Sequence, residues 1–202
     1  MTADWGRLLP RLTNAALAAL WAAYAWRRLD LWQQTGEWVL LALVARNAAV
    51  SALFLCRRPS RAVSRDAAHW AAAIAGTLVG FLYGGGEPVL PAAGAALMVS
   101  AALLGTVASL ALGRSFGIVP ANRGVKNGGP YALVRHPLYA SYLAFDLGFL
   151  LQAASVSNGI VLASMAATTY LRARFEERVL VADPEYRVYA ERTRYMFVPG
   201  LL

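Results

Sequence analysis

The first group of residues that could do chemistry lies between residues 128 and 139 and reads Gly-Gly-Pro-Tyr-Ala-Leu-Val-Arg-His-Pro-Leu-Tyr. Its glycines and prolines predict a bent backbone that other groups can approach closely. Pro137 suits the first turn of a helix, which places His136 at the N-cap with Arg135 just before it. The N–H groups of that helix start, together with the Arg135 side chain, favour an anion. An ordinary basic loop that ends at a helix start explains the same residues equally well.

A second charged group spans residues 172–178 and contains the adjacent carboxylates Glu176 and Glu177. Neighbouring side chains on a helix point about 100° apart, so only one of the two can face a given site squarely. A carboxylate there can bind vicinal hydroxyls or an ammonium group, or accept a proton. The alternative is a solvated, salt-bridged helix that leaves a membrane.

Asp146 is a third candidate because it follows Tyr139 and Tyr142 by seven and four residues, which places the three on one helix stripe. A carboxylate inside an apolar segment is expensive and is therefore a candidate for substrate contact. An ion pair with Arg46, which also lies in an apolar segment, is the alternative, and the sequence favours neither.

The elements that position these residues are apolar. Of the 202 residues, 58% are hydrophobic and 15% are charged, whereas soluble domains have about 45–50% and about 25%. A spanning helix needs about 20 apolar residues, and such runs occupy about 8–26, 38–56, 67–83 and 89–112. A polar stretch at 113–137 follows, and then an apolar block at 138–170. Turn-prone residues at 155–159 interrupt that block, which predicts a helical hairpin and six crossings; one long kinked helix, giving five, is the alternative.

The net charge of +8 and the placement of the basic residues bear on partners and orientation. Lys and Arg lie between apolar runs, which favours a lipid bilayer as the partner and not nucleic acid. The segments 57–65, 113–137 and 171–202 hold four, four and six of the 19 basic residues. Six crossings place all three on one side, which the positive-inside rule assigns to the cytoplasm, for instance of a bacterial inner membrane. One Cys and two His make a metal site implausible.

Together the two polar clusters resemble the superfamily of isoprenylcysteine carboxyl methyltransferases and phospholipid methyltransferases. The resemblance covers the chain from Arg114 onward, and one departure is Ser141, where the family usually has Gly. The residues that carry it are, in order, Gly129-Pro130-Tyr131, Arg135-His136-Pro137-Leu138-Tyr139, Glu176-Glu177, Tyr186, Tyr189, Arg192 and Pro199.

The apolar runs predict an all-α membrane bundle of five to six transmembrane segments, and the resemblance implies a cytosolic C-terminal cofactor-binding region. We expect one domain over 1–202, with four transmembrane helices in 1–112 and the catalytic region in 113–202. The resemblance also implies S-adenosylmethionine as the cofactor, no metal, and a lipophilic small molecule or lipid as the substrate. The residues assigned to the cofactor are Tyr131, Arg135, His136, Pro137, Tyr139, Glu176 and Glu177; to the substrate, Tyr186, Tyr189 and Arg192; and to catalysis, Glu176, Arg192 and Asp146.

Three functions remain open for this sequence. The first is methylation of a lipophilic carboxylate or thiol, as in isoprenylcysteine carboxyl methyltransferases, and the second is methylation of a phospholipid amine. Asp146 favours a cationic acceptor, whereas the Arg-rich tail favours an anionic one. The third is a non-catalytic membrane protein, but a transporter predicts internal symmetry, and the sequence shows no repeat.

Overall fold

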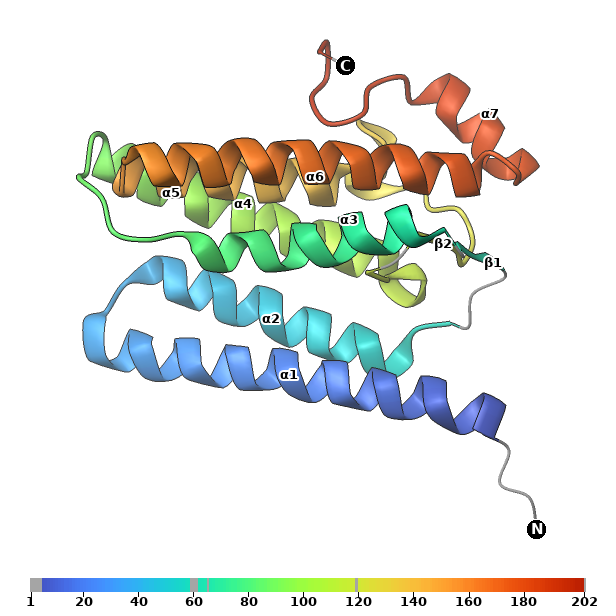
Figure 1. Ribbon diagram of the computed structural model, residues 1–202, viewed down its shortest axis with the longest axis horizontal. Helices are drawn as coiled ribbons and strands as arrows, with labels where there is room; N and C mark the ends of the chain where they lie inside the picture. The colour runs from blue at the N-terminus through green and yellow to red at the C-terminus, as the bar shows by residue number, and fades with distance from the viewer. Residues whose placement is uncertain (1–4, 59–61, 65, 119, 202) are drawn as a thin grey trace.

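The computed structural model describes residues 5–58, 62–64, 66–118 and 120–201. Helices make up most of it, as predicted (Figure 1), and two short strands pair antiparallel. The main helices are α1 (Trp5–Thr35), α2 (Trp38–Cys56), α3 (Ala67–Leu78), α4 (Pro91–Leu112), α5 (Pro137–Gln152), α6 (Val156–Leu180) and α7 (Pro184–Arg192). The short elements are β1 (Ala62–Val63), β2 (Ala121–Asn122) and the 3-10 helices η1 (Val79–Leu82), η2 (Gly113–Ser115) and η3 (Gly129–Ala132).

The helices α1 to α6 run along the long axis of the molecule (Figure 1). Helix α2 packs between α1 and α4, and α5 packs between α4 and α6. Helix α3 packs on α6. One end of the bundle carries β1, β2 and α7, while the turns from α1 to α2 and from α5 to α6 lie at the other end. The polar segments that the sequence analysis singled out therefore gather at one end.

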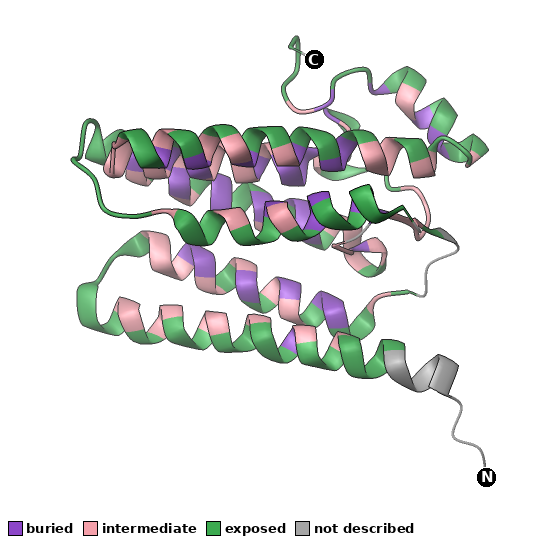
Figure 2. Cartoon of the chain, in the orientation of Figure 1, coloured by how far each residue is buried: buried purple, intermediate pink, exposed green. Residues whose placement is uncertain are grey.

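Two helices of the described chain are long and apolar enough to cross a membrane, namely α2 and the segment Pro91–Ser115 that begins with α4. Only a third of each is buried within the protein, and large apolar side chains of α4 such as Leu103, Val107 and Leu110 face outward. Figure 2 shows exposed residues along the outer faces of the helices. Helix α3 has 12 residues and α5 has 16, which is short for a crossing, so five to six segments stay a prediction.

The apolar block at 138–170 forms the predicted hairpin, and the alternative of one long kinked helix is wrong. Helix α5 ends at Gln152 and α6 begins at Val156. The Ser155 hydroxyl caps α6 by accepting a hydrogen bond from the Asn158 N–H at 3.1 Å. The buried Asn158 amide donates to the Ala153 and Gly84 carbonyls at 2.6 and 3.1 Å. Asn158 thereby ties this turn to the loop before α4.

The C-terminal segment is held across the start of α5. Two backbone hydrogen bonds run from Arg135 N–H to the Tyr195 carbonyl (2.9 Å) and from His136 N–H to the Met196 carbonyl (2.8 Å). As predicted, Pro137 is the first residue of α5 and His136 is its N-cap residue. The chain after α7 therefore closes over the residues that the sequence predicts to bind a ligand.

Candidate active site

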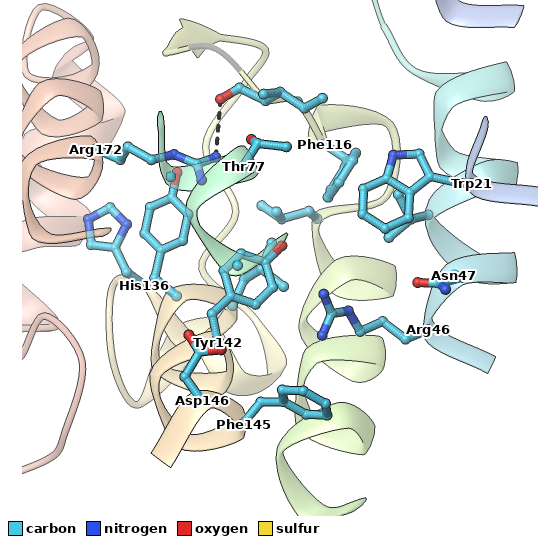
Figure 3. A pocket seen from close by; sticks show the side chains of 18 of the residues that line it. Trp21, Arg46, Asn47, Thr77, Phe116, His136, Tyr142, Phe145, Asp146 and Arg172 are labelled. Atoms are coloured by element: carbon cyan, nitrogen blue, oxygen red, sulfur yellow. Dashed lines mark hydrogen bonds between the residues drawn. The ribbon is translucent and has the colours of Figure 1, made fainter. Parts of the chain in front are cut away.

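A cavity of about 690 Å³ runs through the bundle and is lined by residues from α1 to α7. This volume lies within the range of about 300–1,000 Å³ that is usual for small-molecule sites. Near the start of α5 its lining is tyrosines and charged groups, among them Tyr139, Arg172 and Glu176. Farther along, in what we call the apolar part, side chains such as Leu43 and Phe149 line it together with a few polar groups, among them Arg46 and Asp146. Figure 3 shows side chains from several helices converging on this space.

The two polar clusters, about forty residues apart in the sequence, meet at the polar end of this cavity. The Tyr139 hydroxyl donates a hydrogen bond to Glu176. The Arg135 guanidinium donates through Nε to Glu177 at 2.7 Å, and His136 Nε2 lies 3.2 Å from the same carboxylate oxygen. The predicted meeting of these clusters beside a cavity is confirmed.

The adjacent carboxylates face different surroundings, as their angular separation on α6 requires. Glu176 lines the cavity, whereas Glu177 points at Arg135 and His136 and lies outside the lining. Burial by itself raises the pKa of Glu177, but hydrogen bonds from His136 and Arg135 and their charges outweigh it and lower the pKa to about 2. Glu177 is therefore an ionised anchor, and Glu176 is the carboxylate available to a ligand.

Arg135 is used by the chain itself. Besides its bond to Glu177, its Nη1 donates to the carbonyls of Thr193 and Arg194. The backbone N–H groups of Arg135 and His136 are also taken by the C-terminal segment. The anion cradle predicted at the start of α5 is thus filled largely by carbonyls of residues 193–196. This geometry gives Arg135 a positioning role at the edge of the cavity.

Two arginines that the sequence analysis did not single out as site residues line the polar end instead. Arg172 lies over the Tyr139 ring at 5.1 Å, and its Nη2 donates to the Ile118 carbonyl at 3.4 Å (Figure 3). The buried Nε atoms of Arg172 and Arg123 have no hydrogen-bond partner. Such unsatisfied donors on a cavity wall are unusual and point to a ligand.

Glycines on neighbouring elements make room for both arginines. A Cβ added at Gly76 of α3 would lie 3.0 Å from Arg172 Cδ, and one at Gly117 would lie 2.6 Å from Arg123 Nη1. One signal in the sequence marks Arg172, because it precedes Glu176 by four residues and thus shares its helix face. No comparable signal marks Arg123.

Three tyrosines complete the polar end. Tyr131, Tyr186 and Tyr189 line the cavity, and the Tyr189 hydroxyl donates to the Tyr131 carbonyl at 2.8 Å. Burial raises the pKa of Tyr189 to about 12, and burial followed by the charge of Glu176 also raises that of Tyr131. These phenols are therefore neutral donors and aromatic faces at physiological pH.

The remaining predicted residues, Arg192, Pro137 and Asp146, lie away from the polar end of the cavity or outside its lining. Arg192 is exposed at the end of α7 and does not line the cavity, and neither does Pro137, which is buried at the start of α5. Asp146 lines the cavity farther along α5. Within the described part of the chain, no salt bridge joins Asp146 to Arg46, and no three His, Cys, Asp or Glu side chains come together as a metal site does.

Ser141, the departure from the family pattern, is compensated on the facing helix. Its side chain is 1% exposed, and its hydroxyl donates to the Leu138 carbonyl at 2.6 Å. Gly105 of α4 faces it, and a Cβ there would lie 2.8 Å from the Ser141 oxygen. Gly105 thus leaves room for the Ser141 side chain, and α4 and α5 pack closely beside the cavity.

The model of the phospholipid methyltransferase family matches residues 89–186. Over this segment, the chain is similar to phospholipid methyltransferases. It begins just before α4 and ends within α7, so it contains Tyr131, Tyr139 and Glu176 but not Tyr189 or Arg192. No curated protein matches the sequence significantly.

This match confirms the resemblance to the superfamily of membrane methyltransferases that includes isoprenylcysteine carboxyl methyltransferases. The phospholipid methyltransferase family implies methyltransferase activity, and its name suggests a lipid substrate. Together with the two long apolar helices, it indicates a membrane protein. Since the match begins at residue 89 and not at Arg114, helix α4 belongs to the family segment as well.

Proposed function

We propose that this phospholipid methyltransferase homologue transfers a methyl group from S-adenosylmethionine to a lipophilic acceptor. The observation that carries the proposal is the form of the cavity: a polar end with Tyr139, Arg172 and Glu176 continues into an apolar part between the helices. The polar, charged methyl donor and a lipophilic methyl acceptor need such adjoining environments. Holding both in line in a space that excludes water supplies most of what a methyl transfer requires.

The residues at the polar end fit the charges of S-adenosylmethionine. Its carboxylate suits the guanidinium groups of Arg172 and Arg123, whose Nε donors lack partners. Its ribose hydroxyls or ammonium suit Glu176, which lines the cavity. The faces of Tyr131 and Tyr139 suit the adenine ring or the sulfonium cation.

When bound, S-adenosylmethionine supplies a methyl group already activated by the positive sulfur. The protein groups then have three tasks. Tyr139 orients Glu176 through its hydrogen bond, and His136 stacks against Tyr139 with ring centroids 5.6 Å apart. The Arg135–Glu177 pair fastens α5 to α6 and holds the C-terminal segment over the site.

A carboxylate acceptor, as in isoprenylcysteine carboxyl methyltransferases, is the acceptor that we favour. Besides the two arginines assigned to the donor carboxylate, Lys126 lines the cavity and would attract such an anion. A carboxylate is already a nucleophile, so its oxygen takes the methyl group while the carbon–sulfur bond breaks, and no base is needed.

A phospholipid amine is the second candidate. It is favoured by the description of the matched family and by Asp146 in the cavity wall. A neutral amine attacks the methyl group and then loses a proton, for which Glu176 would be the acceptor.

The positions of the basic segments support an active site that faces the cytoplasm, for instance at a bacterial inner membrane. β1, β2 and α7, which lie in or next to the three Arg-rich segments, share one end of the bundle (Figure 1). The positive-inside rule assigns that end to the cytoplasm. The polar end of the cavity adjoins the same segments and would therefore be open to S-adenosylmethionine from the cytoplasm.

Methyl transfer in a purified system tests the proposal. Detergent-purified protein is incubated with S-adenosylmethionine carrying a labelled methyl group and with a total lipid extract. We expect the label in a lipophilic product, as a base-labile methyl ester for a carboxylate acceptor or as a base-stable N-methyl group for an amine. The control is the double variant Glu176→Ala, Arg172→Ala. If the wild-type protein labels no more lipid than this variant does, the proposal is contradicted.

A further inference from the structure

The apolar part of the cavity contains polar side chains that have no partner. Asn47 of α2 is 2% exposed and Asp146 of α5 is 7% exposed, and both line the cavity. The Asn47 Nδ2 and Asp146 Oδ2 atoms are buried without a hydrogen bond. Buried polar atoms are rarely left unsatisfied, because each costs free energy relative to contact with water. The Arg28 Nε atom and the Tyr83 hydroxyl line the same cavity and also lack a partner. Several such atoms on one cavity wall indicate that a ligand supplies the missing contacts.

Arg46 faces Asp146 across this space without an ion pair between them. Its guanidinium lies over the rings of Tyr142 and Phe145, at 5.0 and 5.9 Å from their centroids. Figure 3 shows Arg46 projecting from α2 on one side and Asp146 on α5 on the other. Aromatic faces hold the cation in place but use none of its N–H donors. Arg46 therefore also keeps hydrogen-bonding capacity for a ligand.

This group is separate from the polar end of the cavity. Asp146 follows Tyr139 by seven residues on α5, which places it about 10 Å farther along the helix. Arg46 lies near the middle of α2, a helix apolar enough to span a bilayer. Charged groups at such a depth are expensive and are kept where they bind something.

We infer that Arg46 and Asp146 form a second polar subsite that recognises a hydroxyl group within the apolar part of the acceptor, about 10 Å from the atom that is methylated. A hydroxyl accepts a hydrogen bond from Arg46 and donates one to Asp146 at the same time. A carbonyl meets only the first need, a carboxylate is repelled by Asp146, and an ammonium is repelled by Arg46. The inference rests on the proposed function, and it narrows the substrate to lipophilic molecules that carry this hydroxyl.

Binding of matched probes tests the inference. The probes are palmitic acid and hexadecylamine, each with and without a hydroxyl on the chain about 10 Å from its head group. Their affinities for the detergent-purified full chain are measured by calorimetry beside that of S-adenosylmethionine. For at least one head group, we expect the hydroxylated probe to bind about tenfold more tightly than its parent.

Variants show where any preference arises. Arg46→Gln and Asp146→Asn should each reduce it to about twofold or less, while the affinity for S-adenosylmethionine stays unchanged and reports an intact fold. The control Thr106→Val should keep the preference, because Thr106 donates to the Ala102 carbonyl of its own helix and does not line the cavity.

Equal binding within both pairs, no binding of any probe, or a preference that survives both substitutions would overturn the inference. The proposed function fails in a different way, since the wild-type protein then does not bind S-adenosylmethionine.

Discussion

The two parts of the cavity differ in how their charged groups are held. At the polar end, Glu177 and Arg135 bond to each other, and Arg135 also bonds to backbone carbonyls of the C-terminal segment. In the apolar part, Arg46 and Asp146 face each other without a salt bridge. A charged group whose hydrogen-bonding atoms already have partners in the protein stabilises the site, whereas one that lacks partners is available to a ligand. By this criterion, we propose that Arg172, Arg46 and Asp146 meet small molecules, together with Glu176, which lines the cavity.

The two parts also come from different regions of the chain. The family match covers residues 89–186, which supply Tyr139, Arg172 and Glu176 at the polar end. Helices α1 and α2 lie outside the match, and α2 supplies Arg46 and Asn47. The proposed donor end thus lies in the family segment, while part of the proposed acceptor end is built by a helix that precedes it. We expect donor and acceptor binding to respond to different substitutions.

Among substitutions that test this difference between the two parts of the cavity, Glu176→Gln should have the largest effect on methyl transfer. The change removes the charge of the one carboxylate at the polar end that faces the ligand, so methyl transfer should fall about 100-fold, chiefly through weaker donor binding. Calorimetry and the labelled-methyl assay measure the two quantities. Glu191→Gln, an exposed carboxylate on α7, is the control, and equal losses in both variants would remove Glu176 from the site.

Replacing Arg172 with Met should weaken S-adenosylmethionine binding about tenfold, since the unpartnered guanidinium donor is lost while most of the side-chain volume is kept. The exposed Arg187→Met of α7 serves as the matched control. Unaltered donor affinity in Arg172→Met would show that this arginine only packs on Tyr139.

The neighbouring carboxylate should behave in the opposite way. Glu177→Gln removes the ionised partner of Arg135 and His136, which should lower the free energy of unfolding by about 2 kcal/mol and the melting temperature by about 5 °C. The donor affinity of the folded fraction should change little. A variant with wild-type melting temperature but lost donor binding would reverse the roles of the two carboxylates.

The pH dependence of stability isolates the same contact. The folded-state pKa of Glu177 is lowered to about 2, so its contribution is fully present above its ordinary value of about 4.3 and is lost as the pH falls towards 2. The difference in melting temperature between wild type and Glu177→Gln should therefore shrink steadily below pH 4.5. A difference that stays constant down to pH 2.5 would argue against an ionised Glu177.

The smallest effect is expected for Arg192→Ala. The sequence predicts a catalytic and substrate-binding role for this residue, but its side chain is exposed and outside the cavity lining. Methyl transfer should change by less than about twofold, as is usual for exposed positions. A loss of tenfold or more would restore the predicted role and indicate that α7 moves when the substrate binds.

Much of this architecture is readable from the sequence where local rules decide it. The apolar run at 38–56 coincides with α2, and Pro137 starts α5 as its fixed backbone angle favours. The helical hairpin follows from the turn-prone residues near 155. Only the family resemblance predicts the approach of Glu176 to Tyr139, because it joins segments 37 residues apart.

Other features depend on contacts that leave little trace in the sequence. The partners of Arg135 are backbone carbonyls of residues 193 and 194, and any residue type provides those. The direction of Arg172 depends on the space left by Gly76 on another helix. Helix α1 reaches Thr35, well beyond the apolar run at 8–26, since a helix can continue through polar residues outside a hydrocarbon layer.

The central claim is that the polar end of one cavity holds an adenosyl donor beside an acceptor in its apolar part. An experimental structure of the protein purified with S-adenosylhomocysteine tests it most directly. We expect density for the ligand between Tyr139, Arg172 and Glu176, with its sulfur towards the apolar part of the cavity. Ligand density outside this cavity, or a saturating ligand that leaves these three side chains without contact, would contradict the account.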